Sequence, residues 1–493
     1  MVRTLFKPTN EIFTKEDTSL DKKPSIYAFL PQVKTLSLVN SYVLVNYESG
    51  SWVALDKEEY QELKTNKEKL QGLKGELLYR MGICSRNGEQ KEFDCHSEYT
   101  EQLYFFEFAV SAGCNLSCKY CFADAQPFNS KANATKDIAE LFIDRIAEHR
   151  IKTRTSIPYI IEFTGGEPLL NFKIIQHTIE YAESTYGSSL DVQFCLQSNA
   201  TLLSNKIIKY LKDHKVGVGL SCDGFEAIQN KQRPFLGGYP SHQVVEDRIK
   251  KLHDLYPENR GGVITVITEE GVNYMPEIAL YLYLNGFHEL VFRPMQEVGR
   301  GAENCRTAPL SELYVQGLFN TLNSVITPIY KEKEELIAER YISLTFQHLL
   351  HPYRAFMCER TPCGGGRNIC LVQPNGNVYS CNQSVGDDRF LLGNLKQVSF
   401  NEMLQSSAGI ALSSRTLDKI EECRNCTFRS WCGSPCPLAV ARGSENIMSK
   451  SSECNVLKPR YTRALSGLLE DEFDLEVVGK LAGFQSPVQW FVF

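Results

Sequence analysis

Near-continuous apolar segments alternate with amphipathic segments from about residue 103 to residue 300. This alternation is typical of a parallel sheet with right-handed crossover helices, because a strand that is buried on both faces has no polar side. Helices are expected between the strands, for example over residues 137–150 and 205–214. The pattern predicts an α/β fold built as an open, TIM-like (β/α)6 partial barrel. Its six strand candidates are residues 103–111, 158–165, 191–198, 216–224, 262–268 and 289–295.

A different pattern precedes the barrel. Three short strands are predicted, and helical periodicity follows over residues 58–67 and 67–82. Residues 1–25 are polar and charged, so we expect disorder there. The strand candidates are residues 35–40, 42–47 and 51–55. The expected organisation is a disordered segment (1–25), a small domain with its linker (26–100), the barrel (101–310), a helical bridge (311–350) and a cysteine-rich C-terminal domain (351–493).

Composition narrows the functional classes. A net charge of −6 over 493 residues argues against a dedicated nucleic-acid binder, which normally has a basic surplus. The sequence has no run of eighteen apolar residues and no apolar segment near its start, so neither a membrane span nor a secretory signal is expected. A cytoplasmic location is therefore expected. Seventeen cysteines are unusual for such a protein and indicate metal binding or redox work, because disulfides are rare in the cytosol.

Three cysteines follow the first predicted barrel strand in the segment SAGCNLSCKYCFADAQ (111–126). The spacing places Cys114, Cys118 and Cys121 on one tight loop, whereas structural zinc sites usually have four protein ligands and C-x2-C pairs. Three ligands around a four-iron cluster leave one iron open. Together with the aromatic Tyr120 before the third cysteine, the loop resembles that of the radical S-adenosylmethionine (SAM) superfamily. The resemblance implies a 4Fe–4S cluster, SAM on its open iron, and a 5′-deoxyadenosyl radical that removes hydrogen from a substrate.

The ends of the next strands extend this resemblance. The second strand ends in GGEP, the third in QSNA and the fourth in LSCDG, while an arginine follows in NKQRPF. In the family, the glycines let the backbone approach the ligand, the glutamate accepts from the SAM ammonium, and the arginine contacts the SAM carboxylate. Ala200 departs from the family's usual glycine. An ordinary turn at GGEP and a surface arginine are the alternative interpretations. The implied SAM-binding residues are Tyr120, Gly165, Gly166, Glu167, Pro168, Ser198, Asn199, Ser221, Asp223 and Arg233.

The C-terminal cysteines resemble a second family. The segments CGGGRNICLVQPNGNVYSC (363–381) and CRNCTFRSWCGSPC (423–436), followed by Cys454, match the order of the SPASM extension. This resemblance implies two auxiliary 4Fe–4S clusters, hence three clusters in all; a zinc ribbon is the alternative. Cys358, or a substrate thiolate on an open iron, is the alternative to Cys370 as fourth ligand of the first auxiliary cluster. The implied ligands are Cys363, Cys370, Cys381 and Cys436 for the first auxiliary cluster, and Cys423, Cys426, Cys432 and Cys454 for the second.

Two further features indicate a peptide substrate. The three N-terminal strands and their helices resemble the winged-helix recognition element that binds the leader of ribosomally made precursor peptides, by adding the leader as a strand against the third strand. A VGRGA-like segment (298–302) occurs in SPASM enzymes that modify such peptides. The layout resembles the thioether-forming maturases of sactipeptides and ranthipeptides, such as the freyrasin-type enzymes. It implies a flavodoxin- or ferredoxin-type electron donor, and bonding of a cysteine sulfur to a carbon of the same peptide.

Other functions remain open at this point. Relatives form C–C or C–O crosslinks, and others oxidise a serine or cysteine of sulfatases to formylglycine. The sulfatase type generally lacks an N-terminal recognition domain, so residues 26–100 argue against it. For the N-terminal domain, a small α/β cap that only packs on the barrel is the alternative interpretation. For the whole chain, a zinc-bound scaffold or peptide-binding chaperone is the alternative from a non-enzymatic class. No catalytic acid or base is assigned from the sequence.

Overall fold

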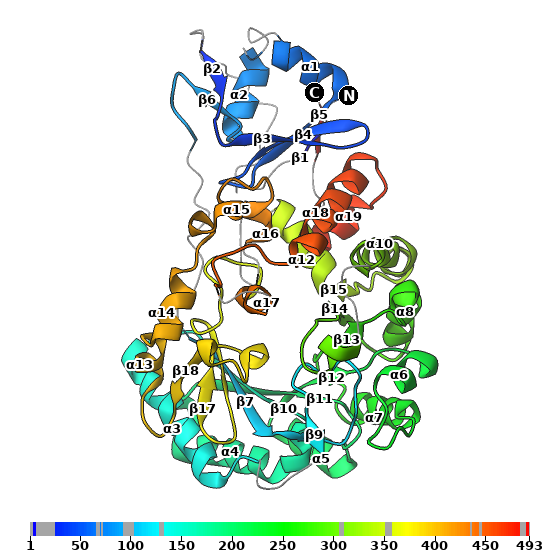
Figure 1. Ribbon diagram of the computed structural model, residues 1–493. Helices are drawn as coiled ribbons and strands as arrows, with labels where there is room; N and C mark the ends of the chain where they lie inside the picture. Colours follow the sequence, from blue (N-terminus) through cyan, green and yellow to red (C-terminus); the bar gives the residue numbers. More distant parts are fainter. Residues whose placement is uncertain are drawn as a thin grey trace. The chain divides into compact units, whose positions relative to one another are not determined.

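The chain forms two compact units (Figure 1). The first, here called the barrel unit, comprises residues 100–340 and 362–415; the second, the terminal unit, comprises residues 1–99, 341–361 and 416–493. The C-terminal cysteine-rich region thus contributes to both units. The computed structural model describes residues 3–5, 25–65, 70, 72–91, 103–127, 133–304, 310–350, 357–433, 436–442, 446–483 and 490–492.

Six consecutive parallel strands form the centre of the barrel unit. They pair in chain order, and each lies within a few residues of its predicted position. The prediction of a six-stranded parallel partial barrel is therefore confirmed. The strands are β7 (Phe105–Ser111), β10 (Tyr159–Gly165), β11 (Val192–Ser198), β12 (Gly217–Ser221), β13 (Val263–Ile267) and β14 (Glu289–Pro294).

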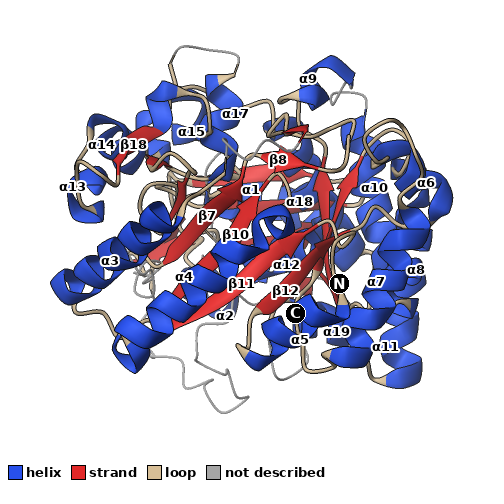
Figure 2. Cartoon of the chain, turned by 90° about the horizontal axis from the view of Figure 1, so that it is seen from below, coloured by secondary structure: helices blue, strands red, loops and turns tan. Residues whose placement is uncertain are grey.

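Helices lie along the sheet between successive strands (Figure 2). Their apolar faces pack against the sheet and form a core. In this core, aromatic side chains of the first strand contact those of the first helix. The Phe108 and Phe142 ring centroids are 4.8 Å apart, and both side chains are fully buried. Burial of such large side chains is the main stabilising contribution to this layer. The helices are α3 (Lys136–Thr153), α4 (Phe172–Thr185), α5 (Asn205–Asp213), α6 (Glu226–Gln232), α7 (His242–Leu255) and α8 (Met275–Leu284).

The sheet continues beyond the six predicted strands. The short strand β15 (Ala338–Glu339) pairs with β14, and β16 (Ile369–Val372) pairs in parallel with β7 on the other side. The strands β17 (Asn377–Tyr379) and β18 (Leu391–Asn394) follow in antiparallel order, which gives ten strands in all. Part of the cysteine-rich region therefore extends the barrel sheet, a pairing between distant segments that local patterns do not reveal.

The predicted bridge over residues 311–350 is mostly helical. It contains α10 (Ser311–Thr321), a π-helical stretch (Leu322–Ile326), α11 (Thr327–Lys333) and α12 (Arg340–Leu350). The boundary between the two units falls at its last helix.

The terminal unit contains the predicted three-stranded antiparallel sheet. It consists of β3 (Val33–Ser37), β4 (Ser41–Asn46) and β5 (Trp52–Asp56), followed by α1 (Lys57–Thr65) and α2 (Gly72–Arg80). A small apolar core joins sheet and helices, including Leu44, Leu63 and Leu78. The succession of three strands and two helices is confirmed.

C-terminal segments complete this unit. The Trp431 Nε1 donates to the Gly50 carbonyl at 2.9 Å, and the Trp52 Nε1 donates to the Leu349 carbonyl at 2.9 Å. The helices of this part are α15 (Glu421–Arg424), α16 (Arg429–Cys432), α17 (Pro437–Ala441), α18 (Cys454–Leu469) and α19 (Leu475–Leu481).

The segment 1–25 was expected to be disordered, and most of it lies outside the described residues. For Arg3–Leu5 the structure differs: these residues form strand β1, which pairs antiparallel with β19 (Trp490–Val492) and lies next to β5.

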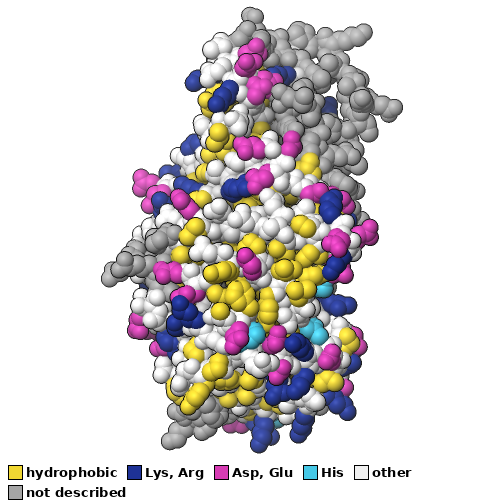
Figure 3. All heavy atoms as spheres, turned by 90° about the vertical axis from the view of Figure 1, so that its right-hand side faces the viewer, with side chains coloured by type: hydrophobic (Ala, Val, Ile, Leu, Met, Phe, Trp, Pro, Cys, Tyr) yellow, Lys and Arg dark blue, Asp and Glu magenta, His cyan; other side chains and the backbone are white. Residues whose placement is uncertain are grey.

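The outer helices carry a mixed surface. Figure 3 shows acidic and basic side chains intermixed on one face, together with a group of apolar side chains. Exposed apolar residues of α8 and α10 include Leu280, Leu284 and Leu313. Within the described residues, no helix combines the length and apolar character needed to cross a membrane.

The residue that departs from the family's glycine has a strained backbone. Ala200 follows β11 with a φ of 69°, in the left-handed region that glycine adopts more easily, and its side chain is fully buried.

We expect Ala200→Gly to stabilise the protein. Relief of about 1–2 kcal/mol of left-handed strain exceeds the loss of about 0.8 kcal/mol for a buried methyl, so the net gain is up to about 1 kcal/mol. Thermal unfolding of the two proteins measures it. Ala139→Gly, inside α3, is the matched control and should destabilise by about 2 kcal/mol, since it loses the methyl and helix propensity together. A melting temperature of Ala200→Gly below that of the wild type would contradict the proposal that the Ala200 backbone is strained.

Candidate functional site

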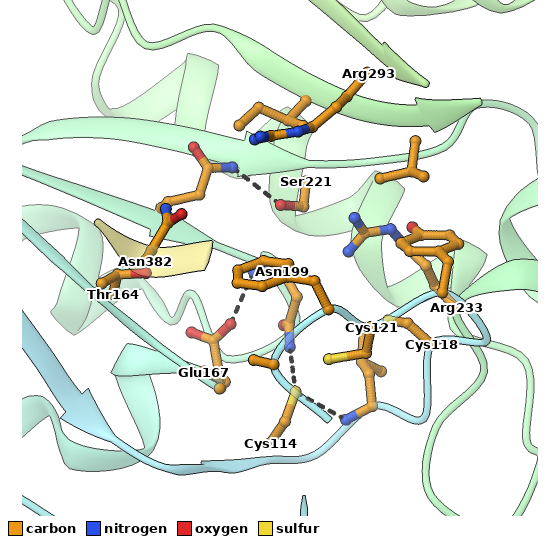
Figure 4. Close-up of a pocket in the computed structure, with 18 of the residues that line it drawn as sticks. Cys114, Cys118, Cys121, Thr164, Glu167, Asn199, Ser221, Arg233, Arg293 and Asn382 are labelled. Atoms are coloured by element: carbon orange, nitrogen blue, oxygen red, sulfur yellow. Dashed lines mark hydrogen bonds between the residues drawn. The ribbon is translucent and has the colours of Figure 1, made fainter. Parts of the chain in front are cut away.

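A cavity of about 210 Å³ lies at the carboxyl ends of the barrel strands (Figure 4). This is the edge at which ligands bind in open parallel α/β sheets. The cysteine loop and the ends of β10, β11, β12 and β14 line it. Two of the ten predicted SAM-binding residues, Pro168 and Asp223, do not line the cavity. The eight that do are Tyr120, Gly165, Gly166, Glu167, Ser198, Asn199, Ser221 and Arg233.

The three cysteines of the first motif lie together at this cavity. Cys114 packs with Leu116 and Ala125, and Cys118 and Cys121 contact the same cluster. The Asn199 Nδ2 lies 3.7 Å from the Cys114 Sγ and hydrogen-bonds to it (Figure 4). The thiols line the cavity without meeting at one point, and no three His, Cys, Asp or Glu side chains of the described residues converge closely enough to hold a single metal ion.

Burial sets the protonation of these thiols. It raises the pKa of Cys114 and raises the pKa of Cys118 to about 12. Such thiols keep their protons at neutral pH unless a cationic group takes the place of the protons. Soft sulfur ligands are also those that iron–sulfur clusters take. The donor set therefore fits an iron–sulfur centre, which would supply the missing positive charge.

The two glycines of GGEP allow the backbone after β10 to lie against the backbone at the start of the cysteine loop. A Cβ on Gly165 would lie 2.1 Å from the Ser111 carbonyl oxygen, and one on Gly166 would lie 2.2 Å from the Gly113 carbonyl oxygen. Backbone hydrogen bonds use this approach, because the Gly166 N–H donates to Ser111 at 2.8 Å and the Glu167 N–H donates to Gly113 at 2.9 Å. We expected these glycines to admit a ligand; the structure shows that they admit the start of the cysteine loop.

Glu167 connects the ends of the second and third barrel strands. Its carboxylate accepts from the Ser198 hydroxyl at 2.8 Å, the Asn199 N–H at 2.8 Å and the Leu169 N–H at 3.1 Å. Burial raises the pKa of this carboxyl to about 7 despite the three donors. A carboxylate has about four acceptor sites, so most of its capacity is used inside the chain.

Tyr120, Asp223 and Arg233 form one buried network. The Tyr120 hydroxyl donates to Asp223 at 2.5 Å, and the Arg233 Nε lies 3.1 Å from the other Asp223 oxygen. The Arg233 guanidinium lies 5.4 Å from the centre of the Tyr120 ring, a cation–π geometry. Arg233 is only 7% exposed, which excludes the alternative of a surface arginine. Asp223 therefore positions two cavity residues and does not face the cavity, where we had expected it.

Sequence reasoning missed the residue that holds the cysteine loop. Arg300, the first residue of α9 (Arg300–Asn304), donates from Nε to the Cys118 carbonyl at 2.9 Å and from its backbone N–H to the Cys121 carbonyl at 3.1 Å. Gly299 allows this approach, because a Cβ there would lie 2.5 Å from the Cys121 carbonyl oxygen. The signal was present in the VGRGA segment, which we used only as a mark of a peptide-modifying enzyme.

The C-terminal cysteine region also reaches this cavity. Asn382 and Gln383, which follow Cys381, contribute to its lining. The Asn382 backbone N–H donates to the buried Glu107 carboxylate at 2.9 Å, and its Nδ2 donates to the same group at 2.5 Å. These contacts connect the residues after β17 to the interior of the barrel.

The four cysteines predicted to bind the second auxiliary cluster lie in the terminal unit, near enough for three of their thiols to affect the pKa of the fourth. Cys432 ends α16, and Cys454 begins α18. Burial raises the pKa of Cys432 well above its usual value, and the nearby thiols of Cys454, Cys423 and Cys426 raise it further. The Cys436 N–H donates to Glu453 at 3.0 Å, next to Cys454.

The cysteines of the barrel unit are arranged differently. Cys363 and Cys381 are close enough that the Cys363 thiol raises the pKa of Cys381, after the larger effects of burial and of Glu107. Cys370 lies within β16 opposite Phe106 of β7, so both side chains point to the same face of the sheet. Glu107, which Asn382 contacts, points to the other face. Our choice of Cys370 as a ligand beside Cys363 and Cys381 is therefore not supported by its orientation.

Comparison with known proteins identifies the two regions. Residues 108–282 match the model of the radical SAM superfamily, and residues 363–427 match the model of SPASM, an iron–sulfur cluster-binding domain. The chain carries a radical SAM domain followed by a SPASM domain. A cysteine-type anaerobic sulfatase-maturating enzyme of Clostridium perfringens (strain 13 / Type A) is 24% identical over 370 residues, which cover 73% of this chain and 95% of the relative.

Solved structures share the fold of the radical SAM domain. Native anSMEcpe with bound AdoMet and Cp18Cys peptide has a TM-score of 0.64 at 20% identity, covering 75% of this chain and 99% of that chain. Streptococcus suis SuiB bound to precursor peptide SuiA has a TM-score of 0.53 at 13% identity, covering 88% and 100%. At these identities the likeness establishes the fold.

We expect Gly166→Ala to weaken iron binding by the radical SAM domain about 10- to 100-fold, the usual effect of disturbing residues behind metal ligands. The added Cβ would displace the Gly113 carbonyl, next to Cys114. Iron content and visible absorbance after anaerobic reconstitution measure the effect.

Gly217→Ala in β12 is the matched control, since a Cβ there makes only an ordinary 3.5 Å contact with the Cys195 Cβ. Equal iron content in the two variants would show that the close approach at Gly166 does not position the cysteines.

Proposed function

We propose that this chain is a peptide-modifying radical SAM enzyme that links a cysteine sulfur of a precursor peptide to a carbon of the same peptide. The observation that carries the reaction class is the cavity at the strand ends, where Cys114, Cys118 and Cys121 lie beside polar groups of four barrel strands. When bound there, a 4Fe–4S cluster and SAM supply a 5′-deoxyadenosyl radical, which removes a hydrogen atom from the peptide.

The chain's own residues have distinct roles in this proposal. The three thiols hold the cluster, and Arg300 holds their loop through the Cys118 and Cys121 carbonyls. Glu167 keeps the ends of β10 and β11 together and has little acceptor capacity left for the SAM ammonium. Ser221, whose hydroxyl accepts from Gln197 at 3.0 Å, adds a polar group to the opposite wall.

The auxiliary clusters belong to the same proposal. We infer two of them, with Cys423, Cys426, Cys432 and Cys454 as ligands of one and Cys363 and Cys381 among the ligands of the other. The electrostatic influence of Cys423, Cys426 and Cys454 on the Cys432 thiol supports this inference for the first of these two sets. Such clusters can accept the electron that peptide oxidation releases, and an external flavodoxin- or ferredoxin-type donor would reduce the cluster that serves SAM.

A peptide substrate is supported by relatives and by the terminal unit. SuiB was solved with precursor peptide SuiA, and its likeness covers 88% of this chain, whereas that of anSMEcpe covers 75%. The sheet β3-β4-β5 with its following helices matches the succession expected of a leader-binding domain. The position beside β5, where we expected a leader strand to add, is next to β1. A leader that adds at β5 would therefore lie close to β1.

A sulfatase-type function is the second candidate. The Clostridium perfringens relative, named for sulfatase maturation, is covered over 95% of its length. Oxidation of one cysteine to formylglycine requires the same hydrogen abstraction but forms no link within the peptide. That relative covers 73% of this chain, and the part without a counterpart favours the precursor-peptide function.

If a short cysteine-containing precursor peptide is encoded beside this gene, we expect that peptide to lose two hydrogen atoms per linkage on co-expression and its linked cysteine to resist alkylation. Mass spectrometry with and without an alkylating reagent measures both. Cys118→Ser should abolish the change, because the cluster loses a ligand.

The same assay separates the candidates. The Cp18Cys peptide should remain unmodified by this chain; its conversion to an aldehyde would favour the sulfatase function. Loss of hydrogen with every cysteine still alkylated would indicate a carbon crosslink and contradict the thioether.

We also expect the leader half of that precursor to bind the full-length chain without its core half, because strand addition uses main-chain hydrogen bonds along the leader. Fluorescence anisotropy of a labelled leader peptide measures the affinity, with a scrambled leader as control. Equal affinity of the leader and its scrambled form would contradict a recognition domain in the terminal unit.

A further inference from the structure

One acidic side chain of the cavity is not explained by the binding of SAM or iron. Glu162 lies in the middle of β10, two residues before Thr164, and both line the cavity. Residues two apart on a strand point to the same face, so Glu162 faces the barrel interior below the GGEP loop. It was not singled out from the sequence, where it stands in the apolar run PYIIEFTG.

The register of the sheet places Glu162 in a row of polar groups. It pairs with Glu107 of β7 on one side and with Cys195 of β11 on the other. Parallel strands in register turn paired side chains to the same face, so all three point into the barrel. The Glu107 carboxylate is held by the two donors of Asn382. Burial raises the pKa of the Cys195 thiol well above its usual value, and the two glutamates raise it further, so that thiol is protonated.

The two cavity glutamates differ in their hydrogen bonds. Glu167 accepts three hydrogen bonds from the chain, as described above. In the described part of the chain, by contrast, no donor bonds to the Glu162 carboxylate, although this group lines the cavity. A part-buried acceptor at a cavity wall that has no hydrogen-bond donor among the described residues can accept from a group of the substrate.

Charged groups around Glu162 set its protonation. Burial raises the pKa of Glu162 to about 7, and Arg340 moderates this effect. Burial and the neighbouring Glu162 raise the pKa of Glu107 well above its usual value, while Arg293 of β14, which lines the same cavity, lowers it. A carboxyl with a pKa near neutrality combines a substantial ionised fraction with useful basicity, which is the property of an efficient general base.

We propose that Glu162 is the general base that takes the thiol proton of the substrate cysteine. The inference rests on the proposed function, in which the sulfur of this cysteine bonds to a carbon of the same peptide. In the step, the S–H bond breaks, its electron pair stays on sulfur, and the proton passes to a Glu162 oxygen. The products are a thiolate and a neutral carboxylic acid, so atoms and charge balance and no oxidant is needed. The thiolate, not the thiol, is the nucleophile that can bond to carbon.

The test uses the full-length enzyme with a cysteine-containing precursor peptide that the wild type modifies, and compares Glu162→Gln with the wild type. We expect 5′-deoxyadenosine to form in both, while linked peptide falls by about 100-fold or more in the variant, the usual contribution of a general base. In the wild type, the linking rate should fall as the pH drops below about 7, because the carboxylate becomes protonated. Glu162→Asp should retain part of the rate and the same direction of pH dependence.

A peptide with selenocysteine in place of the reacting cysteine distinguishes a general-base role of Glu162 from a purely structural role. A selenol is ionised at neutral pH and needs no base, so linkage by Glu162→Gln should recover with this peptide. Glu180→Gln is the matched control: it removes an exposed carboxylate of α4 and should behave like the wild type with both peptides.

The outcomes are distinct. Linkage by Glu162→Gln within twofold of the wild type, or no recovery with the selenocysteine peptide, would overturn the role of Glu162. Failure of the wild type to modify the peptide while it still cleaves SAM would instead overturn the proposed function, and the role of Glu162 with it.

Discussion

The buried Glu167 carboxylate is the constraint on which the site depends. It is an ionisable group inside the protein, and such a group is tolerated only when donors replace the water it has lost. The Ser198 hydroxyl and the Asn199 N–H supply that replacement from the neighbouring strand end. Its own backbone N–H is bound to the Gly113 carbonyl, at the start of the cysteine loop. One residue thereby fixes the ends of three strands relative to one another, and the positions of the thiols follow.

The other polar groups of the cavity fall into two classes. Tyr120, Asp223 and Arg233 contact one another through a hydrogen bond, an ion pair and a cation–π contact, and their network shapes one wall of the site. Glu162 belongs to the second class, since its carboxylate faces the cavity and no described donor bonds to it. Groups that satisfy each other contribute specificity and rigidity, while a poised acceptor at a cavity wall is suited to act on a substrate. Whether a polar group has partners within the protein therefore distinguishes the residues that shape the site from the one that can act on a substrate.

The C-terminal region shows how a sheet edge can be extended to complete a site. β16 pairs with β7, so a segment more than two hundred residues away in sequence becomes the neighbour of the first barrel strand. The chain that follows β17 then contributes Asn382 and Gln383 to the cavity. The orientation of Cys370 comes from the same pairing, because the alternation of β16 directs its side chain to the face of Phe106. The pairing thus decides both which C-terminal residues reach the cavity and which do not.

The sequence by itself determined the six barrel strands, since strands buried on both faces need continuous apolar runs, and such runs are a local property. It also determined the three-thiol loop, because the spacing of Cys114, Cys118 and Cys121 depends only on neighbouring residues. Tertiary structure alone decided that GGEP approaches the cysteine loop, that Arg300 holds this loop, and that Glu162 shares a row with Glu107 and Cys195. These relations join residues that are distant in sequence, through the register of paired strands and through close contact between backbone segments. The hydrophobic periodicity of the sequence contains no information about them. A glutamate within an apolar run looks the same whether its carboxylate is paired or faces a cavity, and only the packing around it distinguishes the two.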